Sequence, residues 1–361
     1  MLRFHWRLPQ GGERPGASRA HQASLAESGL PDLDHQIQFA RAAEASGIDS
    51  LLTDFGWSKP DPILLAAAIG MATTGIRFII AHRSGLTSPT AFVQQINTLS
   101  TLINGRFSLN IVAGHSPEEQ RGYGDLLAHD ERYERTEEFL AVCRAFWRND
   151  GDVNFSGKHY AIEHGRLNTP FLSADRTFPE LHIAGNSPAA QRLSISQGTC
   201  WMRLADTPAR LATELRHVLQ SGKEVGLRCS IIARPTREEA VLAARALVAA
   251  AGSQFDDKGK EGEFVTRSDS VSIKAVHELA NTEWLTRGLW TGAVRSHGAA
   301  AIALVGSPSD VASALLEFGS IGVSQFILSG WPKLDEMLFF GRHVLPLIRE
   351  REQAASVPKS A

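Results

Sequence analysis

The sequence predicts a (β/α)₈ barrel, an α/β fold in which eight strands close into a ring and helices surround it. Eight short apolar runs alternate along the 361-residue chain with segments of helical periodicity. Most of these runs are continuously apolar rather than alternating, which is typical of parallel strands buried on both faces. Eight is also the number of strands that closes such a barrel. A doubly wound open sheet is the structural alternative.

The predicted strands are short and largely apolar. They are LRFHW (2–6), SLLTDF (50–55), RFIIAH (77–82), FSLNIV (107–112), ELHIAG (180–185), CWMRLA (200–205), LRCSIIA (227–233) and QFILSG (325–330). In a barrel, the residues that follow each strand meet at one mouth, where catalytic groups collect. The mouth should therefore contain Asp54, His82, Arg83, Asn110, His115, Asn186, Ser187, Arg228, Arg295 and Trp331.

Six longer segments have the apolar spacing of helices. They cover residues 33–47, 88–105, 131–147, 236–252, 307–319 and 335–350. We expect one domain over residues 1–350, interrupted by two insertions, and a frayed tail at 351–361. Residues 150–179 should form a hairpin-like excursion. Residues 253–275 are polar, charged and glycine-bearing, which is typical of a mobile lid or of a disordered loop.

Composition excludes several classes of protein. The formal net charge is −2 and no long basic block is present, which argues against nucleic acid as the main partner. Three widely spaced cysteines indicate a reducing compartment, and we expect the cytoplasm. The first residues lack the apolar core of a signal peptide, and no apolar stretch approaches 18 residues, so no membrane span is expected.

The stretch AGNSPAAQRL (184–193) closes a predicted strand and opens a helix. Backbone N–H groups at such a helix start, with the side chains of Asn186 and Ser187, can bind a phosphate. The alternative is an ordinary N-cap, because Ser before Pro is common at helix starts.

Other polar residues near the strand ends are open to two interpretations. Arg228 and Arg295 could hold an oxyanion by forked hydrogen bonds, or form salt bridges to barrel carboxylates such as Asp54. Asn110 lies inside an apolar strand, where its amide needs partners from a ligand or from the neighbouring backbone. Tyr133, in the first turn of a helix, could reach an anion at the mouth or pack as an interface aromatic. For His115, His129 and His297, in polar loops, solvated side chains are the simpler expectation.

The order of motifs resembles the bacterial luciferase-like flavin monooxygenases, most closely their alkanesulfonate monooxygenase branch. The resembling stretches are FHWRLP, LTSPTAFVQQINTLSTLINGRFSLNIVAG, HDERYERTEEF, FSGKHY, LWTGAVRSHGAAAIALVGS and GVSQFILSGWPKLDE. They extend over nearly the whole chain. No Gly-rich dinucleotide fingerprint, Walker loop or serine-nucleophile motif competes with this resemblance.

The resemblance implies a barrel that binds reduced FMN (FMNH₂) supplied by a separate NAD(P)H-dependent FMN reductase. Reduced flavin would react with O₂ to give a C4a-(hydro)peroxyflavin that oxygenates a small, anionic organic substrate. In the sulfonate branch the products are an aldehyde and sulfite. A homodimer or homotetramer is implied as well.

The resemblance also implies roles for single residues. The FMN phosphate would be bound by Tyr133, Gly185, Asn186 and Ser187, and Asn110 would lie near the flavin ring and the substrate. Arg228 and Arg295 would hold the anionic oxygen of substrate or peroxyflavin, and Trp331 would wall the pocket. Residues 253–275 match the lid that shields the reactive flavin from water.

Four mouth positions depart from the family pattern. Ser230 replaces a histidine, Trp331 a tyrosine, Lys59 a cysteine and Leu204 a tryptophan. Because the flavin motifs are retained while these positions differ, we expect flavin and oxygen chemistry on an altered substrate. The alternatives are a deazaflavin-dependent oxidoreductase on the same barrel and a non-catalytic flavin-binding barrel protein.

Overall fold

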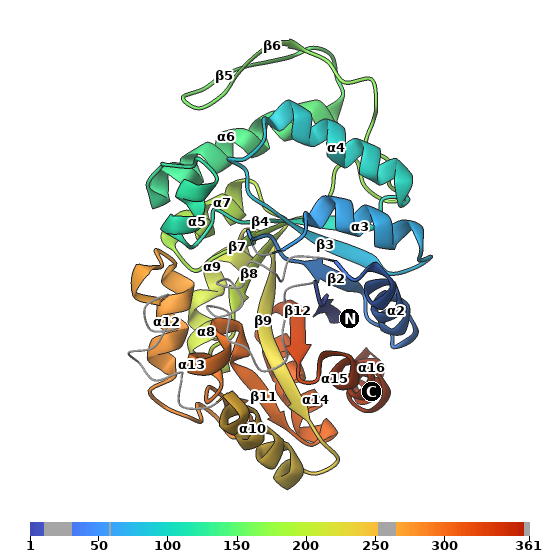
Figure 1. The fold of residues 1–361 in the computed structure, drawn as a ribbon, viewed down its shortest axis with the longest axis vertical. Coiled ribbons are helices and arrows are strands. Elements are labelled where there is room, and N and C mark those ends of the chain that lie inside the picture. The colour runs from blue at the N-terminus through green and yellow to red at the C-terminus, as the bar shows by residue number, and fades with distance from the viewer. Residues whose placement is uncertain (11–30, 58, 252–264, 357–361) are drawn as a thin grey trace, which may run out of the picture.

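The computed structural model describes residues 1–10, 31–57, 59–251 and 265–356. Eight parallel strands form a closed ring in the order β1, β2, β3, β4, β7, β8, β9 and β12, because β12 pairs with β1 and β8 pairs with β9. This arrangement confirms the predicted (β/α)₈ barrel and its eight strands (Figure 1). The ring strands are β1 (Arg3–Arg7), β2 (Ser50–Thr53), β3 (Arg77–His82), β4 (Phe107–Ile111), β7 (Leu181–Ala184), β8 (Cys200–Leu204), β9 (Glu224–Ala233) and β12 (Val323–Gly330).

Helices surround the ring (Figure 1). They are α2 (Leu33–Ala45), α3 (Pro62–Met71), α4 (Pro89–Leu102), α5 (Pro117–Gly122), α6 (His129–Arg148), α7 (Pro188–Ser196), α8 (Pro208–Glu214), α9 (Arg216–Gln220), α10 (Arg237–Ala251), α12 (Val271–Leu279), α13 (Val294–His297), α14 (Pro308–Ser320), α15 (Lys333–Phe339) and α16 (Leu345–Ser356). A π-helical turn, Phe340–Val344, joins α15 to α16, so the helix predicted at 335–350 is interrupted. Across the described ranges, no helix is both long and apolar enough to cross a membrane.

Two additions extend the barrel. The segment 150–179 contains the antiparallel pair β5 (Val153–Ser156) and β6 (Ala161–Gly165), which projects beyond α4 and α6 in Figure 1. Between β9 and β12, the chain adds β10 (Leu289–Trp290) and β11 (Ala303–Gly306), and β11 extends the sheet along the end of β9. Of the segment 253–275, residues 253–264 lie outside the described part of the chain.

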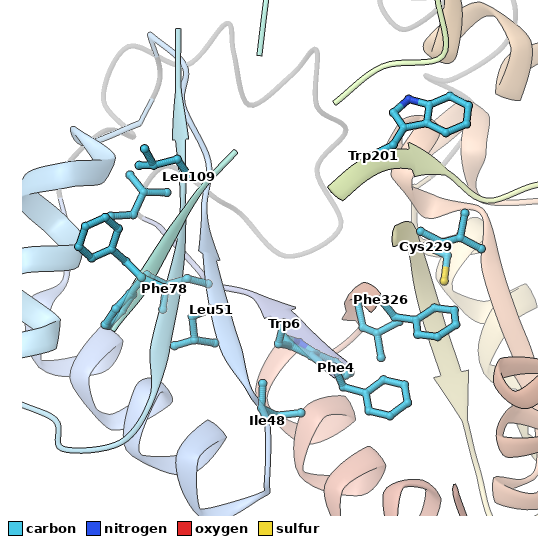
Figure 2. Close-up of a cluster of buried hydrophobic side chains, with 14 of the residues drawn as sticks. Phe4, Trp6, Ile48, Leu51, Phe78, Leu109, Trp201, Cys229 and Phe326 are labelled. Carbon is cyan, nitrogen blue, oxygen red and sulfur yellow. The ribbon is translucent and has the colours of Figure 1, made fainter. Parts of the chain in front are cut away.

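The strands divide their side chains between two environments. Residues that face the helices form the main apolar core, and Figure 2 shows part of it, including Phe4 of β1, Phe78 of β3 and Phe326 of β12. Alternate residues face the barrel interior, where Leu52, Ile79, Cys200, Met202 and Ile327 form a smaller apolar cluster. Inward-facing side chains continue along each strand to its carboxyl end at the mouth of the barrel. The alternation of side chains along a strand therefore determines which of them reach the mouth.

Candidate active site

A cavity opens at the carboxyl ends of the barrel strands, the position at which (β/α)₈ enzymes place their active sites. Its volume is about 190 Å³. It is lined by Asp54, Phe55, Ala81, Arg83, Asn110, Val112, Ala113, Gly114, His115, His129, Tyr133, Ala184, Gly185, Asn186, Ser187, Met202, Arg203, Leu204, Arg228, Ser270, Val271, Ser272, Ile273 and Ile327. Six predicted site residues therefore come together: Asn110, Tyr133, Gly185, Asn186, Ser187 and Arg228.

The start of α7 forms one end of the cavity. Ser187 caps this helix by accepting a hydrogen bond from the Ala190 N–H at 3.2 Å, and Pro188 occupies the first turn. A helix start carries partial positive charge, and the first turn of α7 contains no acidic residue to cancel it. Ser187 is thus an N-cap, which was one of the two interpretations of the sequence. It also lies at the edge of a cavity that an anionic group could enter.

Tyr133 of α6 faces Ser187 and Gly185 across this end. Its phenol oxygen lies 3.5 Å from the Ala184 carbonyl oxygen, and the Ser187 side chain acts on it electrostatically. Burial raises the pKa of the Tyr133 phenol, so the hydroxyl stays protonated and can donate to an anion. Gly185 has φ +129°, in the region that favours glycine, and its bare Cα leaves room for the phenol.

Asn110 occupies the middle of the cavity wall. In the sheet register it lies beside Ala81 of β3 on one side and His182 of β7 on the other. Its amide oxygen is buried and makes no hydrogen bond to any described residue, and the same holds for the amide oxygen of Asn186. Buried amide groups normally have partners, so both side chains are suited to a polar ligand.

Arg228 both lines the cavity and pairs with Asp54. A salt bridge to Asp54 and a position suited to binding an oxyanion are therefore compatible. Its guanidinium lies 3.5 Å from the Asp54 carboxylate, which also binds Arg7. Burial alone would raise the pKa of Asp54, but Arg7, Arg228 and Lys59 outweigh it and hold that pKa well below its usual range. Asp54 is therefore ionised and fixes Arg228 in the mouth.

Arg295 and Trp331 are not among the cavity-lining residues of the described chain. Arg295 lies on α13 and donates a hydrogen bond to the Asn281 amide oxygen at 2.8 Å. The Trp331 ring lies edge-on to the His297 ring, with the ring centroids 5.3 Å apart, and it packs beside the apolar cluster that includes Trp290. Their assigned roles stay predictions.

The four departures from the family pattern occupy different environments. Leu204 lines the cavity. Ser230 is fully buried, where it donates to the Ala300 carbonyl and hydrogen bonds to Ser329, both at 2.9 Å. Lys59 acts electrostatically on Asp54, and Trp331 packs as described above. Replacement of a histidine by Ser230 thus leaves a neutral, satisfied side chain at that position.

Part of the predicted lid forms a wall of the site. Ser272 of α12 accepts a hydrogen bond from the Asn186 N–H at 2.9 Å, and Ser268 donates to the His115 carbonyl at 2.7 Å. Asp269 forms an ion pair with Arg132 of α6. Sequence reasoning treated residues 253–275 as one loop and missed that Ser270–Ile273 line the cavity, because nothing local in the sequence indicates contact with α7.

His115, His129 and His297 are less exposed to solvent than the sequence predicted. His115 and His129 are half-buried and line the cavity. Burial lowers the pKa of His297 to about 4, so that side chain is neutral beside Trp331. Phe55 and Met202 also line the cavity and were not predicted, since apolar side chains give no signal that separates lining from core.

Known proteins share the family and the fold of this chain. Residues 8–325 match the family model described as luciferase-like monooxygenase. A riboflavin lyase crystallised with modified FMN and riboflavin is 21% identical, with a TM-score of 0.76 and coverage of 98% of this chain and 92% of that one. The EDTA monooxygenase of Chelativorans sp. BNC1 is 22% identical, with a TM-score of 0.75 and coverage of 97% and 94%. An F420-dependent secondary alcohol dehydrogenase is 18% identical, with a TM-score of 0.67 and coverage of 96% and 99%.

At these identities the structural likeness shows the shared fold. The family match covers most of the chain, from the residue after β1 to the third residue of β12, and it includes every cavity-lining residue except Ile327. The chain therefore belongs to the luciferase-like monooxygenase family, a family of flavin-dependent oxidoreductases.

Proposed function

We propose that the protein is an FMNH₂-dependent, two-component monooxygenase that oxygenates a small, anionic organic substrate with O₂. The substrate is an alkanesulfonate, cleaved at its C–S bond to an aldehyde and sulfite, or a related anion selected by the altered mouth. The observation that carries the proposal is the anion-binding end of the cavity, where Tyr133, Gly185 and Ser187 meet at the start of α7.

The residues present fit FMN. A phosphate at α7 would meet a helix start without acidic neighbours, a capping hydroxyl and the protonated phenol of Tyr133. Farther along the cavity wall, the buried amide oxygen of Asn110 has the polarity that a flavin ring N–H requires. Bound reduced FMN supplies the two electrons that activate O₂.

The chain's own residues would exclude water and hold the substrate. Met202, Ile273 and Ile327 give the cavity an apolar lining, and the 268–273 wall covers one side of it. Arg228, fixed by Asp54, would bind the substrate anion. In this proposal Arg295 contributes to anion binding and Trp331 to the pocket wall, as the family resemblance implies.

A deazaflavin-dependent oxidoreductase is the second candidate, favoured by the similarity to an F420-dependent secondary alcohol dehydrogenase. F420 is a deazaflavin with a longer acidic tail, which would require more basic residues along the mouth than a simple phosphate does. Among the described lining residues, the α7 end of the cavity offers hydroxyl and backbone groups rather than a row of cations. FMN is therefore the better fit.

The proposal includes partners and location. An NAD(P)H-dependent FMN reductase would supply the reduced cofactor in the cytoplasm. The three cysteines, which are free and buried, are compatible with a reducing compartment. A homodimer or homotetramer is also proposed, since α3 is apolar all round and exposes Leu64 and Met71.

The decisive experiment is an anaerobic titration of the purified protein with FMNH₂ and, separately, with reduced F420. We expect stoichiometric binding of FMNH₂, followed on oxygen pulses with candidate sulfonates by O₂ consumption and release of sulfite or an aldehyde. Binding of reduced F420 alone would favour the second candidate. A folded protein that binds neither cofactor would contradict both.

A further inference from the structure

Arg83 is a cavity residue to which the proposed function assigns no role. It directly follows β3. Side chains alternate along a strand, so Arg83 faces the barrel interior as Ile79 and Ala81 do. Its side chain is only 4% exposed, so the guanidinium is buried at the mouth of the barrel. A buried arginine is costly unless its donors are satisfied.

The surroundings of Arg83 hold it in one orientation. Glu119 of α5 forms an ion pair with one terminal nitrogen of the guanidinium. The rings of Phe55 and Tyr123 lie 4.9 and 5.7 Å from the guanidinium carbon. Glu119 is itself fixed, since it accepts the Trp57 N–H at 2.8 Å. Glu119 and the two aromatic rings thus fix the orientation of the Arg83 guanidinium, as supporting residues do at binding sites.

Two of its donors remain available. The Nε and Nη1 groups of Arg83 are buried and make no hydrogen bond within the described part of the chain. A buried donor without a partner costs free energy that an oxygen-bearing ligand could recover. Glu119 satisfies only one edge of the guanidinium, so the remaining donors suit a ligand with a negative charge or a carbonyl oxygen.

The strand order places Arg83 two strands away from the start of α7. Ala81 of β3 pairs with Asn110 of β4, and Asn110 pairs with His182 of β7, the strand that leads to α7. Two strand spacings separate β3 from β7, about 10 Å. An elongated ligand with its phosphate at Ser187 would pass Asn110 and end at Arg83.

We propose that Arg83 binds the N1–C2 carbonyl edge of the flavin and thereby favours the reduced form. This inference rests on the proposed function. Reduced flavin loses its N1 proton near neutral pH and then carries a negative charge at this edge, whereas oxidised flavin is neutral there. A fixed cation beside the edge therefore stabilises FMNH₂ more than FMN. Arg83 is a cofactor-binding residue that discriminates between redox states.

The test compares dissociation constants of FMN and FMNH₂, measured by anaerobic fluorescence titration, for wild type, Arg83→Gln and Arg83→Lys. We expect Arg83→Gln to weaken FMNH₂ binding about 10- to 150-fold, as for loss of a hydrogen bond to a charged group, and FMN binding less than about 3-fold. Arg83→Lys should keep part of the preference. Equal weakening of both forms, or a rise only in substrate KM, would overturn the assignment.

Arg135→Gln is the matched control. Arg135 is a half-buried arginine paired with a buried carboxylate, Asp125, and it lies on α6 outside the cavity-lining set. Its replacement should leave the FMNH₂-to-FMN affinity ratio unchanged, and the same selective loss in this variant would refute a specific role for Arg83. If wild type binds neither flavin, the proposed function itself fails, which is a separate result.

A measurement on wild type keeps the inference testable if the Arg83 variants do not fold. The ratio of FMNH₂ affinity to FMN affinity should rise from pH 6 to pH 8, because N1 of the reduced flavin loses its proton in this range. The phosphate group is common to both forms, so its contribution cancels in the ratio. Glu119 and Tyr123 are the titratable groups against Arg83, and His115, His129 and Asp54 line the same cavity. A ratio that stays constant or falls over this pH range contradicts the inference.

Discussion

The phenol oxygen of Tyr133 lies 2.9 Å from the point where a Cβ atom on Gly185 would stand. The same Cβ would lie 3.1 Å from the Ala190 side chain, so both sides of this position are filled. The close approach brings a hydroxyl donor from α6 to the start of α7. Glycine at 185 therefore suits both its backbone conformation and the close approach of Tyr133 at the proposed anion-binding end.

Replacement of Gly185 by Ala should weaken FMN binding at least about 10-fold, because the added methyl group displaces Tyr133 from the phosphate position. Fluorescence titration with FMN measures the effect, and circular dichroism verifies the fold. Gly151→Ala is the control: Gly151 has a nearly equal φ of +128°, but no atom of the described residues lies within 4 Å of its Cβ position. Equal loss of binding in both variants would mean that backbone strain, rather than the contact with Tyr133, is responsible.

The wall formed by residues 268–273 gives a second prediction. Asp269→Asn removes the charge that pairs with Arg132, a side chain only 3% exposed, and should loosen the wall. We expect O₂ consumption to continue while a larger share of it ends as hydrogen peroxide, because water reaches the flavin. Peroxide and product are measured together. Asp150→Asn, in an exposed pair with Arg148, should leave coupling unchanged.

Arg295 provides a test of the roles taken from the family resemblance. Arg295→Ala should lower kcat/KM far more than FMN affinity if the guanidinium acts on the substrate anion. Its hydrogen bond to Asn281 joins α13 to the turn after α12, so Asn281→Ala removes that contact and serves as the control. Similar kinetic losses in the two variants would indicate a structural role for Arg295 instead.

The barrel was predictable because each ring strand carries its own local signal, a short apolar run, and eight such runs specify closure. Helix α3 was not predicted, since its sequence PILLAAAIGM is apolar on every face and has no helical period. The strand β11 was missed because it lies outside the ring, between β10 and the end of β9. Local signals therefore identify the ring but not every element outside it.

The lining of the candidate cavity was predictable where it follows strand ends. Asn110 and Arg228 lie on ring strands with inward parity, and both line the cavity. Arg295, by contrast, lies on α13 after the short antiparallel strand β10, so the strand-end rule does not fix its distance from the mouth. Ser272 reaches the cavity through its bond to Asn186, 86 residues away in sequence, a contact that only the tertiary fold creates.

The exposed apolar face of α3 predicts self-association. Leu64 and Met71, two helical turns apart, are 71% and 67% exposed. The double variant Leu64→Glu, Met71→Glu should be monomeric by light scattering if this face joins two copies. Leu242→Glu, at a residue that is 64% exposed on α10, is the control and should keep the wild-type mass. An unchanged mass in the double variant would place the interface elsewhere.

Buried histidines predict loss of stability in acid. His82 is stacked on Phe92 with ring centroids 3.9 Å apart, and burial lowers its pKa to about 3. His5, also fully buried, has its pKa lowered to about 3 by burial and by its neighbours His182 and Arg3. Between pH 3 and the ordinary histidine pKa of 6.5, the unfolded chain binds more protons than the folded one, so stability rises with pH in this window.

The stability contributed by each neutral histidine is therefore complete above pH 6.5 and is lost as the pH falls, by about 2 kcal/mol per residue at pH 5. Urea unfolding at pH 7.5 and pH 5 measures the difference. His82→Phe keeps the stacked ring but cannot be protonated, so its loss of stability between the two pH values should be about 2 kcal/mol smaller than that of wild type. His35→Phe, on the exposed first turn of α2, is the control. An equal acid loss in wild type and His82→Phe would show that His82 does not contribute to this pH dependence.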